Sequence, residues 1–140
     1  MKKQIAFVCM TVGGIVEILI AVMHFVWPYE LIKYGEFSFL SPKYQELLIL
    51  SSIAIGLCLF IFGTLSVYFS TKLKTESESA WLFGISQGIL WIARAVFELI
   101  YPVKVPLFFI TNPTTLVFPL AILIGLIFLV PLLIFRKEFI

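Results

Sequence analysis

Two ionisable side chains lie within the first long apolar stretch of the sequence. Glu17 and His24, the only histidine of the chain, are seven residues apart. Side chains at this spacing share one face of an α-helix and lie about two turns, or ~10 Å, apart along its axis. A carboxylate and an imidazole can exchange protons with a ligand or bind its polar head. This pair is therefore the first candidate for chemistry.

A second charged pair, Arg94 and Glu98, occupies the third apolar stretch and also shares a helix face. Charged side chains in a membrane cost about 2.5–3.5 kcal/mol each at mid-helix, so they normally face the bundle interior and form pairs. Depth along the helices predicts that Glu17 pairs with Arg94 near the membrane centre. It also predicts that His24 pairs with Glu98, about 11–12 Å further out. Arg94 and Glu98 can in addition form an ion pair within their own helix.

The candidate ligand-binding residues combine these charges with two neighbours on the same side of the third stretch. They are Glu17, His24, Gln87, Trp91, Arg94 and Glu98. Glu17, His24 and Glu98 are also the candidates for acid and base catalysis. No metal site is expected, because the chain has no aspartate and Arg94 would repel a cation. The sequence identifies no cofactor, and a single histidine excludes a bis-histidine haem within one chain.

The composition indicates that membrane helices must position these residues. Of the 140 residues, 61% are hydrophobic and only 13% are charged, unlike an ordinary soluble domain. A hydrocarbon core of ~30 Å needs roughly 20 apolar residues per helix, and such runs occur four times. We expect spans at about 5–27, 47–69, 80–100 and 116–135. The predicted fold class is all-α: one integral membrane domain over 1–140, an up-down bundle of four transmembrane helices.

The distribution of basic residues predicts the orientation of this bundle. Lysine and arginine are enriched in short cytoplasmic loops. One side would hold six basic residues and the other three: Lys2, Lys3, Lys72, Lys74, Arg136 and Lys137 against Lys33, Lys43 and Lys104. Both termini are therefore expected in the cytoplasm, for a multi-pass protein of a plasma or inner membrane. The net charge of +2 makes no patch suited to nucleic acid.

Small and polar residues predict how the helices approach one another. The second span carries Ser52, Gly56, Gly63 and Ser66 on one line, which suits close packing and provides hydroxyls for hydrogen bonds. The fourth span is expected to close the bundle without supplying chemistry, and its prolines need not break it. The segment 28–46 is predicted to lie at the membrane interface. The segment 101–115, with its apolar Leu107 to Ile110, is predicted to lie over the bundle mouth.

The first span also carries a family resemblance. Gly14-x-x-Glu17 followed by Ala21-x-x-His24-Phe25-x-x-Pro28 resembles the first helix of the DoxX-like small four-helix membrane proteins. The resemblance covers the first helix only, and the second span lacks the glutamate that such proteins frequently carry. It implies a compact up-down bundle of four helices. The family includes subunits of quinone-linked oxidoreductases.

Three functions are compatible with the sequence. The first is binding of a small amphipathic molecule, lipid or quinone-like, in a polar pocket in the outer half of the bundle. The second is an accessory subunit of a larger membrane complex, or a homodimer, in which the ion pairs only fix helix packing. The third is an intramembrane acid–base enzyme of the sterol-isomerase type. In every case membrane lipid is a partner.

Overall fold

The protein is built from four long helices. The computed structural model describes residues 2–33, 35–73, 75, 77–104 and 110–139. The long helices are α1 (Lys2–Leu31), α3 (Pro42–Lys72), α4 (Ser77–Ile100) and α5 (Thr114–Ile134). Two short elements, α2 (Gly35–Ser38) and the 3-10 turn η1 (Arg136–Glu138), lie after α1 and α5. The all-α prediction is confirmed, and each long helix is long and apolar enough to cross a membrane.

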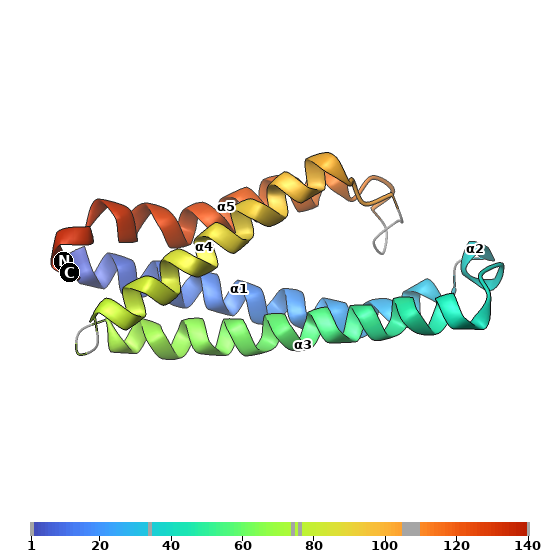
Figure 1. Cartoon of the computed structure of the whole chain (residues 1–140), viewed down its shortest axis with the longest axis horizontal. Coiled ribbons are helices and arrows are strands. Elements are labelled where there is room, and N and C mark those ends of the chain that lie inside the picture. The colour runs from blue at the N-terminus through green and yellow to red at the C-terminus, as the bar shows by residue number, and fades with distance from the viewer. Residues whose placement is uncertain (1, 34, 74, 76, 105–109, 140) are drawn as a thin grey trace.

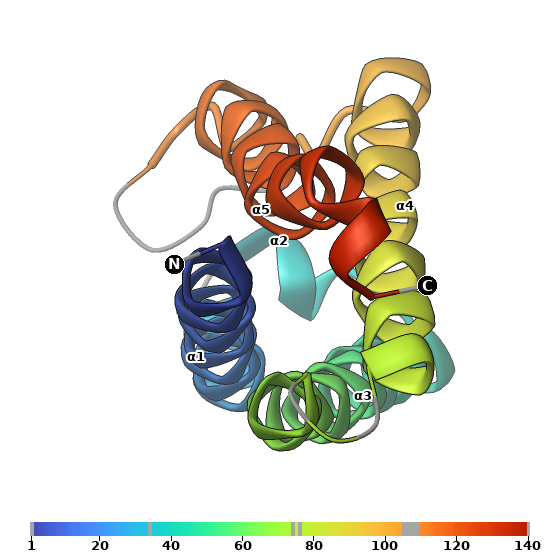
Figure 2. The same ribbon diagram turned by 90° about the vertical axis from the view of Figure 1, so that its left-hand side faces the viewer.

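The long helices form two antiparallel pairs. Successive long helices run in opposite directions, and both chain ends lie at the same end of the molecule (Figure 1). Seen along the bundle, the helices follow one another around a ring in the order α1, α3, α4 and α5 (Figure 2). Packing is most extensive within the α1/α3 pair and within the α4/α5 pair. Helices α1 and α4 therefore occupy opposite corners of the ring.

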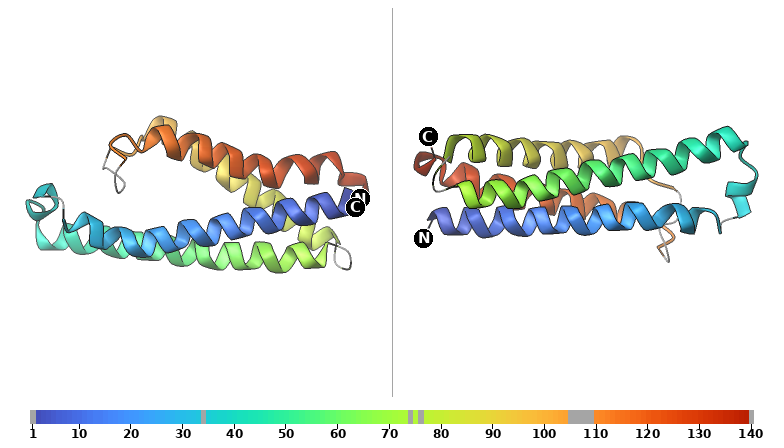
Figure 3. Two further views of the ribbon diagram at one scale, coloured as in Figure 1. Left: turned by 180° about the vertical axis from the view of Figure 1, so that it is seen from behind. Right: turned by 90° about the horizontal axis from the view of Figure 1, so that it is seen from below.

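The two helix pairs are close together at one end only. They lie against each other at the end that holds both termini and diverge towards the end that holds α2 (Figure 1). The views from behind and from below show the same arrangement (Figure 3). Most of the side chains in the main cluster of buried apolar residues belong to the closed end: Ala6, Met10, Leu73, Ala80, Phe128, Leu132 and Phe139. The hydrophobic core therefore holds the pairs together near the termini.

Facing glycines explain the tight contact within each pair. A Cβ atom added to Gly14 of α1 would lie 2.7 Å from the carbonyl oxygen of Gly63 on α3, and the converse distance is also 2.7 Å. In the second pair, a Cβ added to Gly88 of α4 would lie 3.1 Å from the carbonyl oxygen of Gly125 on α5. Backbones that approach this closely pack well without a hydrophobic driving force, which is typical of helix contacts in membranes.

Helix α1 continues past its proline to Leu31, whereas the first span was predicted to end near residue 27. Proline has no N–H, so Pro28 leaves the carbonyl of His24 without its usual partner within the helix. The hydroxyl of Ser52 on α3 donates to that carbonyl oxygen at 2.8 Å. The helix therefore reaches Leu31, and α3 already begins at Pro42, where proline suits the first helical turn.

The fourth long helix contains two prolines and remains continuous. As predicted, Pro119 and Pro131 lie inside α5 without ending it. Leu107, Phe108 and Phe109, predicted to lie over the bundle mouth, fall outside the described residues.

Candidate functional site

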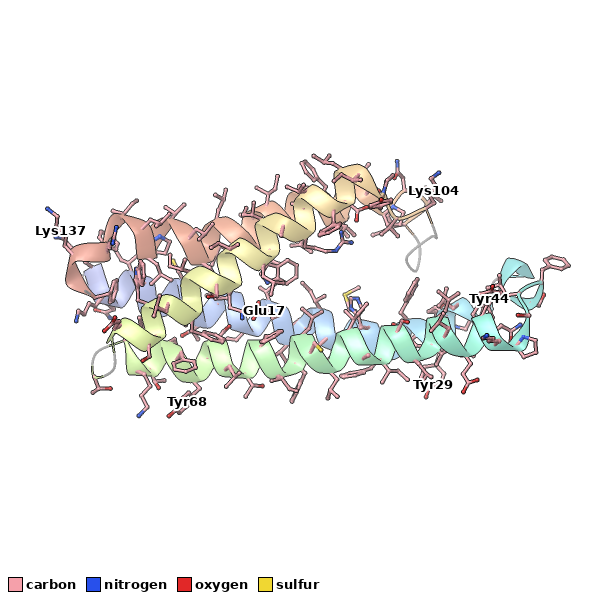
Figure 4. All side chains as sticks on the ribbon, viewed as in Figure 1. Glu17, Tyr29, Tyr44, Tyr68, Lys104 and Lys137 are labelled. Carbon is pink, nitrogen blue, oxygen red and sulfur yellow. The ribbon has the colours of Figure 1, made fainter. Side chains whose placement is uncertain are left out.

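Glu17 is the most deeply buried charged-type side chain of α1. Its exposed fraction is 0%, and it lies midway along the bundle where α4 passes α1 (Figure 4). The indole N–H of Trp91 on α4 donates to its Oε1 at 2.6 Å. The hydroxyl of Ser66 on α3 donates to its Oε2 at 3.1 Å. One carboxyl group thus connects three helices.

Both hydrogen-bond partners of the Glu17 carboxyl group are neutral side chains. A buried polar group is costly unless hydrogen-bonded, and here each carboxyl oxygen has one donor from a different helix. The indole of Trp91 is long enough to reach α1 from the opposite corner of the ring. We call Glu17, Ser66 and Trp91 the central lock. It lies between the tightly packed half and the diverging half of the bundle (Figure 4).

Arg94 and Glu98 form a second cluster, further along α4. The guanidinium Nη2 of Arg94 lies 2.7 Å from Oε2 of Glu98, an ion pair at the i,i+4 spacing. The other oxygen of Glu98, Oε1, accepts the backbone N–H of Val103 at 2.8 Å and the hydroxyl of Thr114 at 2.7 Å. Glu98 therefore ties the end of α4 to the segment that follows it and to the first residue of α5.

The two ion pairs predicted between helices are wrong. Glu17 is bonded to Trp91 and Ser66 rather than to Arg94, and Glu98 is bonded to Arg94, Val103 and Thr114 rather than to His24. The physical reason is the arrangement of the helices. Because α1 and α4 are at opposite corners and diverge outward, the nearest partner of Arg94 is one turn away on its own helix.

His24 lies apart from both clusters. Its side chain is half-buried, and its Nδ1 lies 3.0 Å from the carbonyl oxygen of Ile20 on the preceding turn. Since a carbonyl only accepts, Nδ1 is the donor and Nε2 is the acceptor of the neutral ring. In the described part of the chain, Nε2 has no hydrogen-bond partner. One nitrogen of the imidazole is therefore fixed and the other is unused.

Unused hydrogen-bonding capacity also occurs inside the bundle. Gln87 is 4% exposed and lies one turn before Trp91 on α4, yet its amide has no hydrogen-bond partner among the described residues. The guanidinium of Arg94 forms an ion pair with Glu98, while its side chain is 39% exposed. In the described part of the structure, the fully enclosed side-chain atoms without a hydrogen-bond partner are Nε1 of Trp27 and Oε2 of Glu98, so the amide of Gln87 keeps contact with the surface and can bind water or a ligand there.

Ser66 and Thr114 complete the two clusters, and only the role of Ser66 could be predicted from the sequence. Ser66 belongs to the small and polar line of the second span, and its hydroxyl acts as that line predicts. Thr114, the first residue of the fourth long helix, donates a hydrogen bond to Glu98 that was not predicted from the sequence. It precedes the apolar run that was used to place that span. Only its position directly after Pro113, a common place for a helix to begin, gave any signal.

Comparison with known proteins gives no further information about this site. No protein-family model, curated protein or solved structure matches the chain. The chemistry must therefore be argued from the side chains themselves. Within the described ranges no cluster of three or more histidine, cysteine or acidic side chains is placed to hold a metal. On the diverging side of the central lock, the guanidinium of Arg94 and the Nε2 of His24 can still form hydrogen bonds. The amide of Gln87 can do so on the other side.

Proposed function

We propose that the protein is a multi-pass membrane protein that binds a small amphipathic molecule, lipid or quinone-like, between its two helix pairs. Membrane insertion is supported by the length and apolarity of the four helices and by their surface. Large apolar side chains are exposed along every long helix, among them Leu19, Leu57, Ile89 and Leu123. Such a surface is stable in hydrocarbon and unstable in water.

The proposed orientation places both termini in the cytoplasm. The closed end of the bundle carries the described basic residues Lys2, Lys3, Lys72, Arg136 and Lys137, while Lys33, Lys43 and Lys104 belong to the diverging end. The excess at the closed end supports a cytoplasmic location for it. The diverging half would then lie in the outer leaflet.

The observation that carries the binding proposal is the unsatisfied polar capacity along the bundle axis. Glu17 and Glu98 are supplied with donors by the protein itself, whereas Nε2 of His24, on the diverging side of the central lock, has no partner in the described structure. Arg94 has further N–H groups beyond the one near Glu98. A ligand with an anionic or carbonyl head would satisfy such donors, and its apolar tail would match the lipid-facing helix surfaces.

Geometry suggests how such a ligand would enter. Arg94 lies on the diverging side of the central lock and its side chain is 39% exposed, so an amphipathic molecule would approach it from the outer leaflet. Its head would bind Arg94, with the Nε2 of His24 as a second polar contact on the facing pair. The closed end of the bundle would prevent passage to the cytoplasmic side. We therefore propose a binding protein rather than a channel.

The test is to identify what copurifies with the protein. Native mass spectrometry of the chain extracted in mild detergent should show a bound small molecule, and Arg94→Gln and His24→Ala should each reduce its occupancy roughly tenfold. The matched control is Ser86→Ala, because Ser86 is exposed on α4 and its hydroxyl is bonded to Leu82 of the same helix. If the wild-type chain carries no ligand, or if Ser86→Ala has the same effect as Arg94→Gln, the proposal is wrong.

An accessory subunit of a larger membrane complex is the second candidate. It is supported by the complete satisfaction of Glu17, which behaves as a packing residue. It would also agree with the resemblance of the first helix to DoxX-like proteins. A partner helix lying between the diverging pairs would then take the place of the ligand. Blue native electrophoresis of solubilised membranes distinguishes the two, because only the second candidate migrates with a larger assembly.

An acid–base enzyme of the sterol-isomerase type has less support. A general acid or base needs a free position facing the substrate. Both oxygens of Glu17 and both oxygens of Glu98 already have protein partners. Only His24, through Nε2, keeps such a position.

A further inference from the structure

The two ends of the chain meet in a basic hollow at the closed end of the bundle. The hollow has a volume of about 360 Å³ and is lined by Lys2, Leu133, Ile134, Phe135, Arg136 and Lys137. The start of α1 and the end of α5 come together there, and Lys137 lies at this extremity (Figures 1 and 4). Residues from opposite ends of the sequence therefore form one site, away from the central lock and from Arg94.

Aromatic side chains position the cations around this hollow. The indole N–H of Trp81 donates to the carbonyl oxygen of Leu132 at 2.9 Å, in the last turn of α5. The guanidinium of Arg136 lies 5.8 Å from the ring of Trp81, and the ammonium of Lys3 lies 5.6 Å from the ring of Phe139. Both are cation–π distances. Of these two cations, Arg136 lines the hollow, and it lies over the half-buried ring of Trp81. Lys3 is not a lining residue, but it adds positive charge at the same end of the bundle.

We propose that this hollow binds the phosphate head group of an anionic phospholipid. Of its described lining residues, three are cationic and none is acidic. A guanidinium matches phosphate oxygens in a two-pronged geometry, and lysines add point charge. Leu133 and Ile134 are exposed beside these cations, so they are placed to contact the first methylenes of the acyl chains. The combination of charge and apolar surface distinguishes a lipid from a soluble phosphate.

This inference depends on the proposed membrane orientation but not on the proposed ligand near Arg94. With the termini in the cytoplasm, the hollow lies at the head-group level of the inner leaflet, where anionic lipids are enriched. Trp81 is then at the same interface, the usual place for tryptophan in membrane proteins. The bound lipid would bridge the first and last helices of the bundle.

The experiment compares lipid retention by the full-length chain in detergent. Native mass spectrometry after equilibration with equal amounts of phosphatidylglycerol and phosphatidylcholine should show phosphatidylglycerol retained roughly tenfold better. The double variant Arg136→Gln/Lys137→Gln should bring the two lipids close to parity. The control Lys33→Gln/Lys43→Gln removes the same charge from the opposite end and should preserve the preference. Arg94→Gln should also preserve it, which separates this site from the proposed ligand site.

Three outcomes would overturn the inference. One is equal retention of both lipids by the wild-type chain, and another is an equal loss of preference in the Lys33/Lys43 control. The third is displacement of phosphatidylglycerol by millimolar glycerol 3-phosphate, which would assign the hollow to a soluble phosphate. If the double variant does not fold, Arg136→Lys tests the same point. It keeps the charge but loses the two-pronged geometry, so the preference should fall to an intermediate value.

Discussion

The indole nitrogen of Trp91 lies 2.6 Å from Oε1 of Glu17, and this hydrogen bond crosses the bundle between opposite helices. It is the shortest polar contact that joins the two helix pairs among the described residues. Its removal should therefore weaken the association of the pairs more than the loss of an equivalent surface contact.

Trp91→Phe should lower the free energy of unfolding by about 1–3 kcal/mol more than Trp27→Phe, because it deprives a buried carboxyl of a donor. Trp27 is the matched control, since its buried indole nitrogen has no hydrogen-bond partner. Thermal unfolding in detergent gives the comparison. In a Glu17→Leu background the difference should disappear, as a double-mutant cycle requires. A difference that persists in that background would contradict a stabilising hydrogen bond between Trp91 and Glu17.

Ser52→Ala should be destabilising by about 1–2 kcal/mol, because it leaves the carbonyl of His24 without a donor. In a Pro28→Ala background the same change should cost less, since residue 28 then has an N–H for that carbonyl. Thermal unfolding of the four proteins of this cycle measures the coupling. Ser51→Ala, on the exposed side of the same helix, is the control and should have little effect.

Gly14→Ala should separate α1 from α3 and be destabilising by about 1–3 kcal/mol, because the new methyl group meets the backbone carbonyl of Gly63. Gly35→Ala is the control, since no atom lies within 4 Å of a Cβ added there. Denaturation of both variants in the same detergent provides the measurement. Equal stability of the two variants would show that the glycine contact does not hold the pair together.

Thr114→Val should loosen the connection between α4 and α5, because Glu98 loses one of its donors. The expected loss of stability is about 1–2 kcal/mol. Hydrogen exchange of the peptide containing Val103 should also become faster, since its N–H bonds to the same carboxyl oxygen. Thr64→Val is the control, because Thr64 is exposed and its hydroxyl contacts only the carbonyl of Phe60 on its own helix.

The orientation is tested by labelling with a membrane-impermeant maleimide. In a Cys9→Ser/Cys58→Ser background, Tyr29→Cys should react in intact cells and Lys137→Cys should react only after lysis. Tyr29 is 71% exposed, and the two positions lie towards opposite ends of the bundle (Figure 4). The reverse pattern of labelling would invert the proposed orientation.

The sequence predicts which helices exist better than it predicts which of them touch. Four apolar runs of sufficient length require four long helices in almost any arrangement. The i,i+4 spacing of Arg94 and Glu98 likewise makes their ion pair a local property. Ser66 was visible as a polar position on an otherwise small-residue face of its helix.

The pairing across the bundle could not be predicted because it depends on the order of helices around the ring. Depth along the helix axis is available from residue number, so Glu17 and Arg94 were placed at similar heights. The position of each helix around the ring and the divergence of the two pairs cannot be read from residue numbers. These two features place Trp91 rather than Arg94 next to Glu17. Thr114 was missed because the charge of Glu98 suggested an ionic partner rather than a hydroxyl group.

The unequal lengths of the helices have a further consequence for the proposed insertion in a bilayer. α3 has 31 residues and α5 has 21, so their lengths are about 46 Å and about 32 Å. A hydrocarbon layer of about 30 Å matches α5 and is too thin for α3, which must tilt or project. No single bilayer thickness suits both hairpins. Thickness therefore acts differently on the two halves of the molecule, and a thicker membrane favours a more upright α1/α3 hairpin.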